Sequence, residues 1–312
     1  MKPIIYPEMW REVTKDNIIQ TFKVDDQMYI FDEVNSARMY LLVGKTGAFL
    51  FDTGFGFQEF RSKIEAITDL PLTVVCSHGH DDHIYGAYQF DEAYINEADY
   101  ELLMSNDNPE QLAKQILARK YKTPNIDELV DREEYLKLDI KKCHWKFVKP
   151  GDKFDLGGLT VEIYPLPGHT KGSIAAYCPE RKALFCGDAM SKNHQLVYGQ
   201  SLEISSEPQE FIAALTRLCK LDVETVWPGH GDTPAGADLI SDTREMLIHF
   251  AHEADPAKDG KEHTGPSIFG PKNGNKKRMT YTFHYKDLYM TYNPGHLDQI
   301  HRFMDTHNGA VE

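Results

Sequence analysis

The sequence predicts an α/β fold, and three observations support this prediction. Four short apolar segments are separated by Asp, Asn, Ser and Gly residues, as in strands joined by tight turns, and they span 21–24, 27–31, 37–43 and 48–51. A segment with apolar residues at helical spacing follows over 57–69 and ends before Pro71. The β-branched run 72–75 then predicts a buried strand that stops directly before a cluster of polar residues.

The middle of the chain is predicted to be helical. A helix is expected to open over 84–90, followed by a short strand at 94–95. Charged, helix-favouring segments then cover 97–104, 109–120 and 126–138. We expect these segments to form a helical insertion over about 97–140, lying over or beside the mouth of the active site. Its mixed charges are typical of a solvated face.

A second strand-rich half begins near the hairpin turn at Gly157-Gly158, which follows predicted strands at 146–148 and 153–156. Further strands are expected over 159–164, 174–177, 183–186 and 223–227. An amphipathic helix is predicted over 207–220 and a closing helix over 237–254. Residues 1–254 would therefore form one domain.

The last part of the chain, 255–312, is predicted to be a linker and C-terminal extension. Residues 255–278 are rich in Gly, Pro, Lys and Asn, which favours a long loop. A strand is expected over 279–285 and a short helix over 297–304. The extension could pack on the core of its own chain or on a partner subunit in a homo-oligomer, and the sequence does not choose between these arrangements.

The polar cluster after strand 72–75 has the composition of a metal site. His78 and His80 are two residues apart, so an extended chain directs both side chains to one side. Asp82 and His83 fall on the turn that follows. This single loop could offer two imidazoles to one metal ion, and a carboxylate and an imidazole to a second, which are ligands that zinc accepts.

Five motifs in order resemble those of the metallo-β-lactamase-fold hydrolase superfamily. Besides 78–83, they are Leu50-Phe51-Asp52-Thr53-Gly54, Gly168-His169-Thr170-x-Gly172-Ser173, Cys186-Gly187-Asp188 and Pro228-Gly229-His230-Gly231. The resemblance spans 41–232 and leaves 1–20 and 255–312 uncovered. It implies an αββα sandwich, in which each half contributes a sheet and flanking helices.

The resemblance also implies a ligand set for two Zn²⁺ ions, with iron or manganese as alternatives. The first ion would bind His78, His80 and His169, the second would bind Asp82, His83 and His230, and Asp188 would bridge them. The ions would share a bridging hydroxide as the nucleophile, and Asp82 would help to hold it and handle its proton. Asp52 would orient a metal-bound group.

The bridging position of Asp188 narrows the implied activity. The β-lactamases of the superfamily generally lack an aspartate there, so the glyoxalase II-like, lactonase and phosphodiesterase-like branches are favoured. A thioester of glutathione or coenzyme A is the expected substrate. A lactonase or phosphodiesterase is the alternative, and a non-catalytic metal-binding protein is a third hypothesis that the complete ligand set disfavours.

Three further residues are candidates for the substrate pocket. Tyr85 follows the metal loop and either lines the site or packs in the core. His194 and Tyr198 lie shortly after Asp188, in a segment that could border the pocket. The remaining histidines match no ligand motif and are interpreted as ordinary surface or packed side chains.

Composition limits the partners and the compartment. Lys and Arg total 34 against 48 Asp and Glu, a formal net charge of -14, which argues against a nucleic-acid-binding surface. No apolar run approaches the length of a membrane span, and no signal peptide is recognised. The 5 cysteines show no CxxC spacing and indicate free thiols in a reducing compartment. A cytoplasmic enzyme acting on a small molecule is expected.

Overall fold

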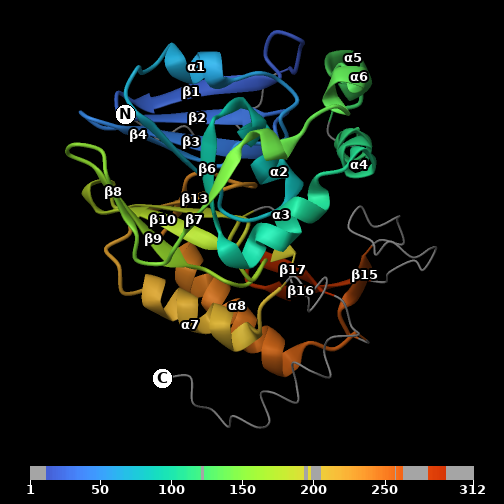
Figure 1. Ribbon diagram of the computed structural model, residues 1–312. Coiled ribbons are helices and arrows are strands. Elements are labelled where there is room, and N and C mark those ends of the chain that lie inside the picture. The colour runs from blue at the N-terminus through green and yellow to red at the C-terminus, as the bar shows by residue number, and fades with distance from the viewer. Residues whose placement is uncertain are drawn as a thin grey trace.

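A computed structural model describes residues 12–120, 123–192, 196–197, 205–256, 258–262 and 280–292. Two sheets stack face to face with helices outside both, as Figure 1 shows, so the predicted αββα sandwich is confirmed. The first, seven-stranded sheet has the order β1-β2-β3-β4-β5-β6-β7. Its strands are β1 (Ile19–Asp25), β2 (Met28–Glu33), β3 (Ala37–Val43), β4 (Ala48–Phe51), β5 (Leu72–Val75), β6 (Glu92–Asn96) and β7 (His144–Val148).

The second, six-stranded sheet has the order β14-β13-β11-β10-β9-β8. Its strands are β8 (Lys153–Asp155), β9 (Thr160–Pro165), β10 (Ile174–Cys178), β11 (Ala183–Gly187), β13 (Thr225–Pro228) and β14 (Ala235–Gly236). Helices α7 (Pro208–Leu218) and α8 (Asp238–Glu253) cover its outer face. The predicted strand at 146–148 is β7, which is the last strand of the first sheet, so the second sheet begins only with β8.

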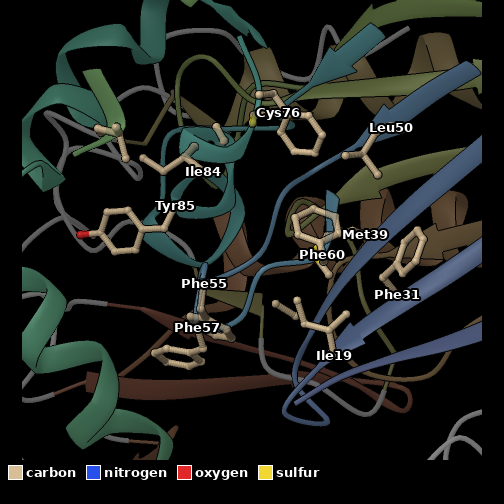
Figure 2. Packing of buried hydrophobic residues seen from close by; sticks show 14 of the residues in the cluster. Ile19, Phe31, Met39, Leu50, Phe55, Phe57, Phe60, Cys76, Ile84 and Tyr85 are labelled. Atoms are coloured by element: carbon tan, nitrogen blue, oxygen red, sulfur yellow. The ribbon is translucent and has the colours of Figure 1, made fainter. Parts of the chain in front are cut away.

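Side-chain alternation along the strands builds the layers. On β3, Tyr40 and Leu42 point into the core between the sheets, where they join Phe185 and Trp227 of the second sheet. The alternate residue Met39 points to the outer core beneath the helices, which Figure 2 shows. Because both faces of the strand are covered, its sequence is almost continuously apolar.

The parallel part of the first sheet places the metal loop. Strand β5 pairs in parallel with β4 and β6, so the carboxyl ends of these strands lie at one edge. The loop that begins at Cys76 leaves β5 at this edge, which is where open α/β sheets position functional loops.

Several predicted helices are shorter or divided. The helix expected over 57–69 is reduced to α1 (Arg61–Glu65), because the backbone N–H groups of Phe55 and Phe57 donate to the Glu33 carboxylate and fix a loop there. The helix expected over 84–90 begins earlier as α2 (Asp81–Ile84) and continues as the 3₁₀ turn η1 (Tyr85–Gln89).

The helical insertion consists of short elements that pack on the outer core of the first sheet. They are η2 (Glu97–Asp99), α3 (Tyr100–Asn106), α4 (Pro109–Arg119), α5 (Ile126–Leu129), α6 (Arg132–Tyr135) and η3 (Ile140–Lys142). The single helix predicted over 126–138 is broken between α5 and α6, because the Asp131 side chain accepts hydrogen bonds from the N–H groups of Glu133 and Glu134 and starts a new helix. The expected place of the insertion over or beside the mouth of the active site stays a prediction.

The described part of the C-terminal extension belongs to a third sheet. Its order is β12-β17-β16-β15, with β12 (Leu196–Val197), β15 (Gly260–Glu262), β16 (Thr280–Tyr285) and β17 (Leu288–Tyr292). Phe283 and Tyr292 pack on Phe250 of α8, with ring centroids 5.6 and 5.0 Å apart. The predicted strand at 279–285 is therefore present and packs on its own chain. The helix predicted over 297–304 lies outside the described residues.

None of the helices in the described ranges has the length and apolar character needed to cross a membrane.

Candidate metal centre

Three buried histidines from two loops converge on one point. His78 and His80 follow β5, and His169 follows β9 after the turn at Pro167-Gly168. His80 Nδ1 lies 3.0 Å from His78 Nε2 and 2.8 Å from His169 Nε2. Burial, the main cause, lowers the pKa of His80 to about 3 and that of His78 well below its usual value. Neutral rings with converging lone pairs are suited to bind one divalent metal ion.

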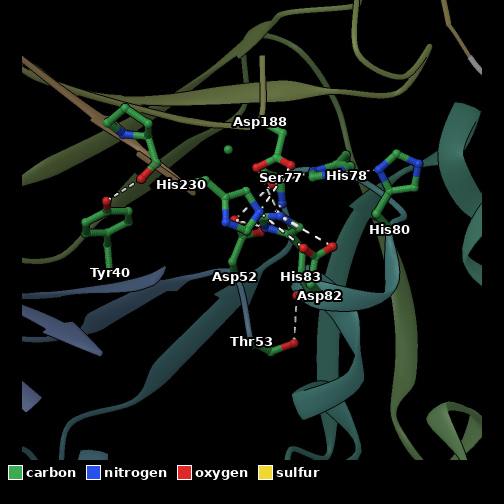
Figure 3. Close-up of polar contacts among 12 residues, drawn as sticks. Tyr40, Asp52, Thr53, Ser77, His78, His80, Asp82, His83, Asp188 and His230 are labelled. Atoms are coloured by element: carbon green, nitrogen blue, oxygen red, sulfur yellow. Dashed lines mark hydrogen bonds and ion pairs between the residues drawn. The ribbon is translucent and has the colours of Figure 1, made fainter. Parts of the chain in front are cut away.

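A second cluster lies beside the first and contains Asp82, His83, Asp188 and His230. Asp188 joins the two clusters, as Figure 3 shows in part. Its Oδ1 lies 3.1 Å from His83 Nε2, and its Oδ2 lies 3.3 Å from His230 Nε2 and 3.8 Å from His169 Nε2. One carboxylate therefore reaches ligand atoms of both clusters.

The second cluster is built to hold positive charge. Burial opposes ionisation of His83, but Asp188, Asp52 and Asp82 outweigh it and raise the pKa of His83 well above its usual value. Burial likewise opposes ionisation of Asp188, yet His230 and His83 lower its pKa well below the usual range. The carboxylates thus attract a cation strongly, and a divalent ion would satisfy them together with the imidazole lone pairs.

Two further observations fit metal ions at these positions. Within the described residues, His83 Nε2 and Asp188 Oδ1 are buried atoms without a hydrogen bond of ordinary geometry. A Cβ on Gly229 would lie 2.8 Å from both Asp188 Oδ1 and His83 Cε1, so only glycine leaves space beside these ligands. The donor set of imidazoles and carboxylates suits zinc, and also iron or manganese.

The family follows from these motifs and from direct comparison. A model of the metallo-beta-lactamase superfamily matches residues 33–230, which includes both clusters. The chain belongs to the metallo-beta-lactamase superfamily. It is therefore a metal-dependent hydrolase of this superfamily, and its His/Asp clusters are consistent with a dinuclear metal site.

Relatives in the superfamily include thioester-cleaving enzymes. The chain is 27% identical over 223 residues to the human acyl-coenzyme A thioesterase MBLAC2. The matched region covers 66% of this chain and 77% of the relative. It is also 31% identical over 156 residues to the hydroxyacylglutathione hydrolase of Ruegeria pomeroyi. That matched region covers 49% of this chain and 57% of the relative. A metallo-beta-lactamase structure from Pontibacter korlensis shares the fold, with a TM-score of 0.51, 20% identity and coverage of 74% and 99%.

Asp52 contacts His83 of the second cluster directly and reaches His78 of the first cluster through Ser77. Its Oδ2 lies 2.9 Å from His83 Nδ1. It also accepts hydrogen bonds from Ser77 N at 2.6 Å and Ser77 Oγ at 2.9 Å, and Ser77 Oγ lies 2.9 Å from His78 Nδ1. These contacts engage the Nδ1 atoms and leave each Nε2 directed at the metal position. Asp52 is therefore placed to orient ligands, and this role stays a prediction.

Of the three candidate pocket residues, Tyr85 is the only one that the described part of the chain includes. It is 1% exposed, and its hydroxyl donates a hydrogen bond to the Asn106 carbonyl oxygen at 2.7 Å. Figure 2 shows the ring among the apolar side chains of the outer core. The packing alternative for Tyr85 is thus supported, and the pocket-lining alternative is not. His194 and Tyr198 lie outside the described residues.

Asp99 is a buried residue beside the site that sequence reasoning missed. Its carboxylate accepts hydrogen bonds from both loops that carry the three-histidine cluster. In the sequence it lies in a charged helical segment and resembles a solvated residue. The only local signal is its position at the end of the turn that follows β6.

Proposed function

We propose that the chain is a dinuclear zinc-dependent hydrolase that cleaves thioesters of small molecules. The observation that carries this proposal is the position of Asp188, whose two carboxylate oxygens face ligands of both clusters. A site of this kind brings two metal positions to one reacting centre. Two zinc ions held there would supply Lewis acidity that polarises a carbonyl oxygen and activates water at neutral pH.

The carboxylates mark the open side of the site. The side chains of Asp82 and Asp188 are 14% and 16% exposed, whereas those of His83 and His230 are 0% and 5% exposed. A substrate would therefore approach across the two aspartates. Asp82 Oδ2 lies 3.1 Å from His230 Nε2, and His83 and His230 lower the pKa of Asp82 against the effect of burial. A carboxylate in this position can hold the attacking water and accept its proton.

The thioester assignment draws support from the relatives and from the chemistry of the leaving group. Both named relatives, the acyl-coenzyme A thioesterase and the hydroxyacylglutathione hydrolase, act on thioesters according to their names. The structural likeness to a metallo-beta-lactamase supports the fold alone. A thioester substrate is also chemically suited to the site, because a thiolate leaves readily without a dedicated acid.

A panel of substrates tests the proposal. We would measure initial rates of the zinc-loaded protein on an acyl-coenzyme A, an acyl-glutathione, a lactone, a phosphodiester and a β-lactam, and use kcat/KM for comparison. We expect selective release of thiol, and the ratio of the two thioesters would identify the carrier. Preferential cleavage of the lactone or the phosphodiester would overturn the thioester assignment in favour of that branch. Two bound metal ions without turnover of any substrate would overturn the hydrolase proposal.

A further inference from the structure

The helical insertion contacts the metal loop at the backbone of a single residue, Gly79. Gly79 lies between the ligands His78 and His80. Its N–H donates to Asp99 Oδ2 at 2.8 Å, and its carbonyl oxygen accepts a hydrogen bond from Asn106 Nδ2 at 2.9 Å. Asp99 and Asn106 both belong to the insertion, so both polar groups of this backbone position are held from one side.

Asp99 also holds the loop that carries the third histidine. Its Oδ2 accepts a hydrogen bond from Thr170 Oγ1 at 2.7 Å, and its Oδ1 accepts one from Gly172 N at 2.7 Å. Thr170 directly follows His169. A single carboxylate, 1% exposed, thus joins the two loops that must converge for three imidazoles to bind one ion.

The loops are shaped to admit this carboxylate. A Cβ on Gly172 would lie 2.6 Å from Asp99 Cγ, and a Cβ on Gly79 would lie 2.9 Å from the Asp99 carbonyl oxygen. Neither position has room for a side chain. The close approach fixes the distance between the loops, because the Gly172 backbone confines Asp99 at its carboxylate and the Gly79 backbone confines it at its carbonyl oxygen.

We propose that Asp99 is a positioning residue that sets the metal affinity of the three-histidine cluster, with Asn106 as its partner on Gly79. This inference rests on the two-metal site of the proposed function. The hydrogen bonds to Asp99 come from Gly79, Thr170 and Gly172, which belong to the two loops of the three-histidine cluster, so its effect is confined to one of the two metal positions. Ion binding at that position therefore depends on the insertion, and at the other position it does not.

The test measures zinc affinity at each position separately. His230→Ala leaves the three-histidine cluster intact, and His169→Ala leaves the second cluster of Asp82, His83, Asp188 and His230 intact. Asp99→Asn is added to each background, and zinc affinity is measured by competition with a chromophoric chelator. The amide of the substituted asparagine places an N–H₂ group against a backbone or hydroxyl donor. We therefore expect zinc affinity to weaken by about tenfold or more in the His230→Ala protein. In the His169→Ala protein, the change should stay within about threefold.

Two further variants keep the test decisive. Asp131→Asn makes the same substitution at an exposed helix cap of the insertion and should leave both affinities unchanged. Thr170→Val removes one of the three hydrogen bonds to Asp99, and a smaller, selective weakening should follow if Asp99→Asn does not fold. Equal weakening in both backgrounds, or unchanged affinity with a lowered Tm, would show a purely structural role and overturn the inference. Because no substrate is used, a wild-type protein that binds two zinc ions without cleaving thioesters would refute the proposed function alone.

Discussion

The buried carboxylate of Asp52 lies 2.9 Å from His83 Nδ1, on the side of the ring that faces away from Asp188. Through Ser77, the same carboxylate reaches His78 Nδ1. One side chain at the end of β4 therefore supports a ligand in each metal cluster. Its backbone has a positive φ of 68°, an unusual conformation for aspartate, and the contacts with Ser77 and His83 compensate for it.

Asp52→Asn should weaken zinc binding. The amide cannot accept hydrogen bonds at both of its heavy atoms, so Ser77 or His83 loses a partner. Loss of such supporting contacts typically costs about 10- to 100-fold in metal affinity. Competition with a chelator would measure the zinc affinity. Asp155→Asn, a substitution at an exposed residue of β8, is the control. Wild-type affinity in the Asp52→Asn protein would exclude a role in orienting the ligands.

Asp82→Asn should nearly abolish turnover while the fold is retained. Asp82 is a partly exposed carboxylate of the second cluster, and its replacement removes both a negative charge and a proton acceptor. We expect kcat to fall by about 10²- to 10⁴-fold, the usual contribution of a positioned acid–base group. Circular dichroism and Tm would confirm folding.

The matched control for Asp82→Asn is the neighbouring residue. The Asp81 carboxylate is directed at Gln111 Nε2, 2.6 Å away, rather than at the metal clusters. Asp81→Asn should therefore retain most of the activity. Comparable activity in the Asp82→Asn and wild-type proteins would contradict the assigned role of Asp82.

Glu33 should make stability depend on pH. Burial raises the pKa of its carboxyl to about 8, although hydrogen bonds from Phe57 N and Phe55 N oppose the shift. The folded state therefore holds this proton more tightly than the unfolded state. The resulting stability is fully present below the unfolded pKa near 4.5 and is lost as pH rises through about 8.

The comparison with Glu33→Gln isolates this effect, because glutamine does not titrate. Between pH 5.5 and 8.5, the free energy of unfolding of the wild type should fall relative to that of the variant by about 3 kcal/mol. Denaturant unfolding with excess zinc at each pH would measure this difference in the free energy of unfolding. The metal site is common to both proteins, so its own pH dependence cancels in the comparison. Parallel pH profiles would show that Glu33 does not change protonation over this range.

The sequence predicts the sheets and the metal clusters well for physical reasons. Strands β1 to β5 are marked by apolar runs and turn residues, and β2, β3 and β4 are almost fully buried as the pattern indicates. His78 and His80 are two residues apart in the sequence, and an extended backbone is expected to direct both side chains to one side. Their approach to His169 and Asp188, however, was inferred from family resemblance, because local patterns contain no information on contacts between distant segments.

The errors arise where tertiary contacts override local preference. The helix expected from 57 is delayed because the Glu33 carboxylate, distant in sequence, captures the N–H groups of that segment. Asp99 reads as a surface charge in the sequence, and its burial depends on two glycines in other loops that leave space for it. The second strand of the C-terminal hairpin, β17, was not predicted, because Lys286 at the turn adopts a positive φ of 52° that its residue type does not indicate.

Stepwise metal restoration tests the two-metal mechanism most directly. The metal-free protein would be titrated with zinc while hydrolysis of an acyl-coenzyme A or acyl-glutathione thioester is followed, with bound zinc determined in parallel. We expect no turnover without metal and a plateau of activity at two zinc ions per chain, since Asp188 faces both clusters. Full activity in the metal-free protein, or a plateau of activity at a single bound zinc ion, would contradict the two-metal mechanism.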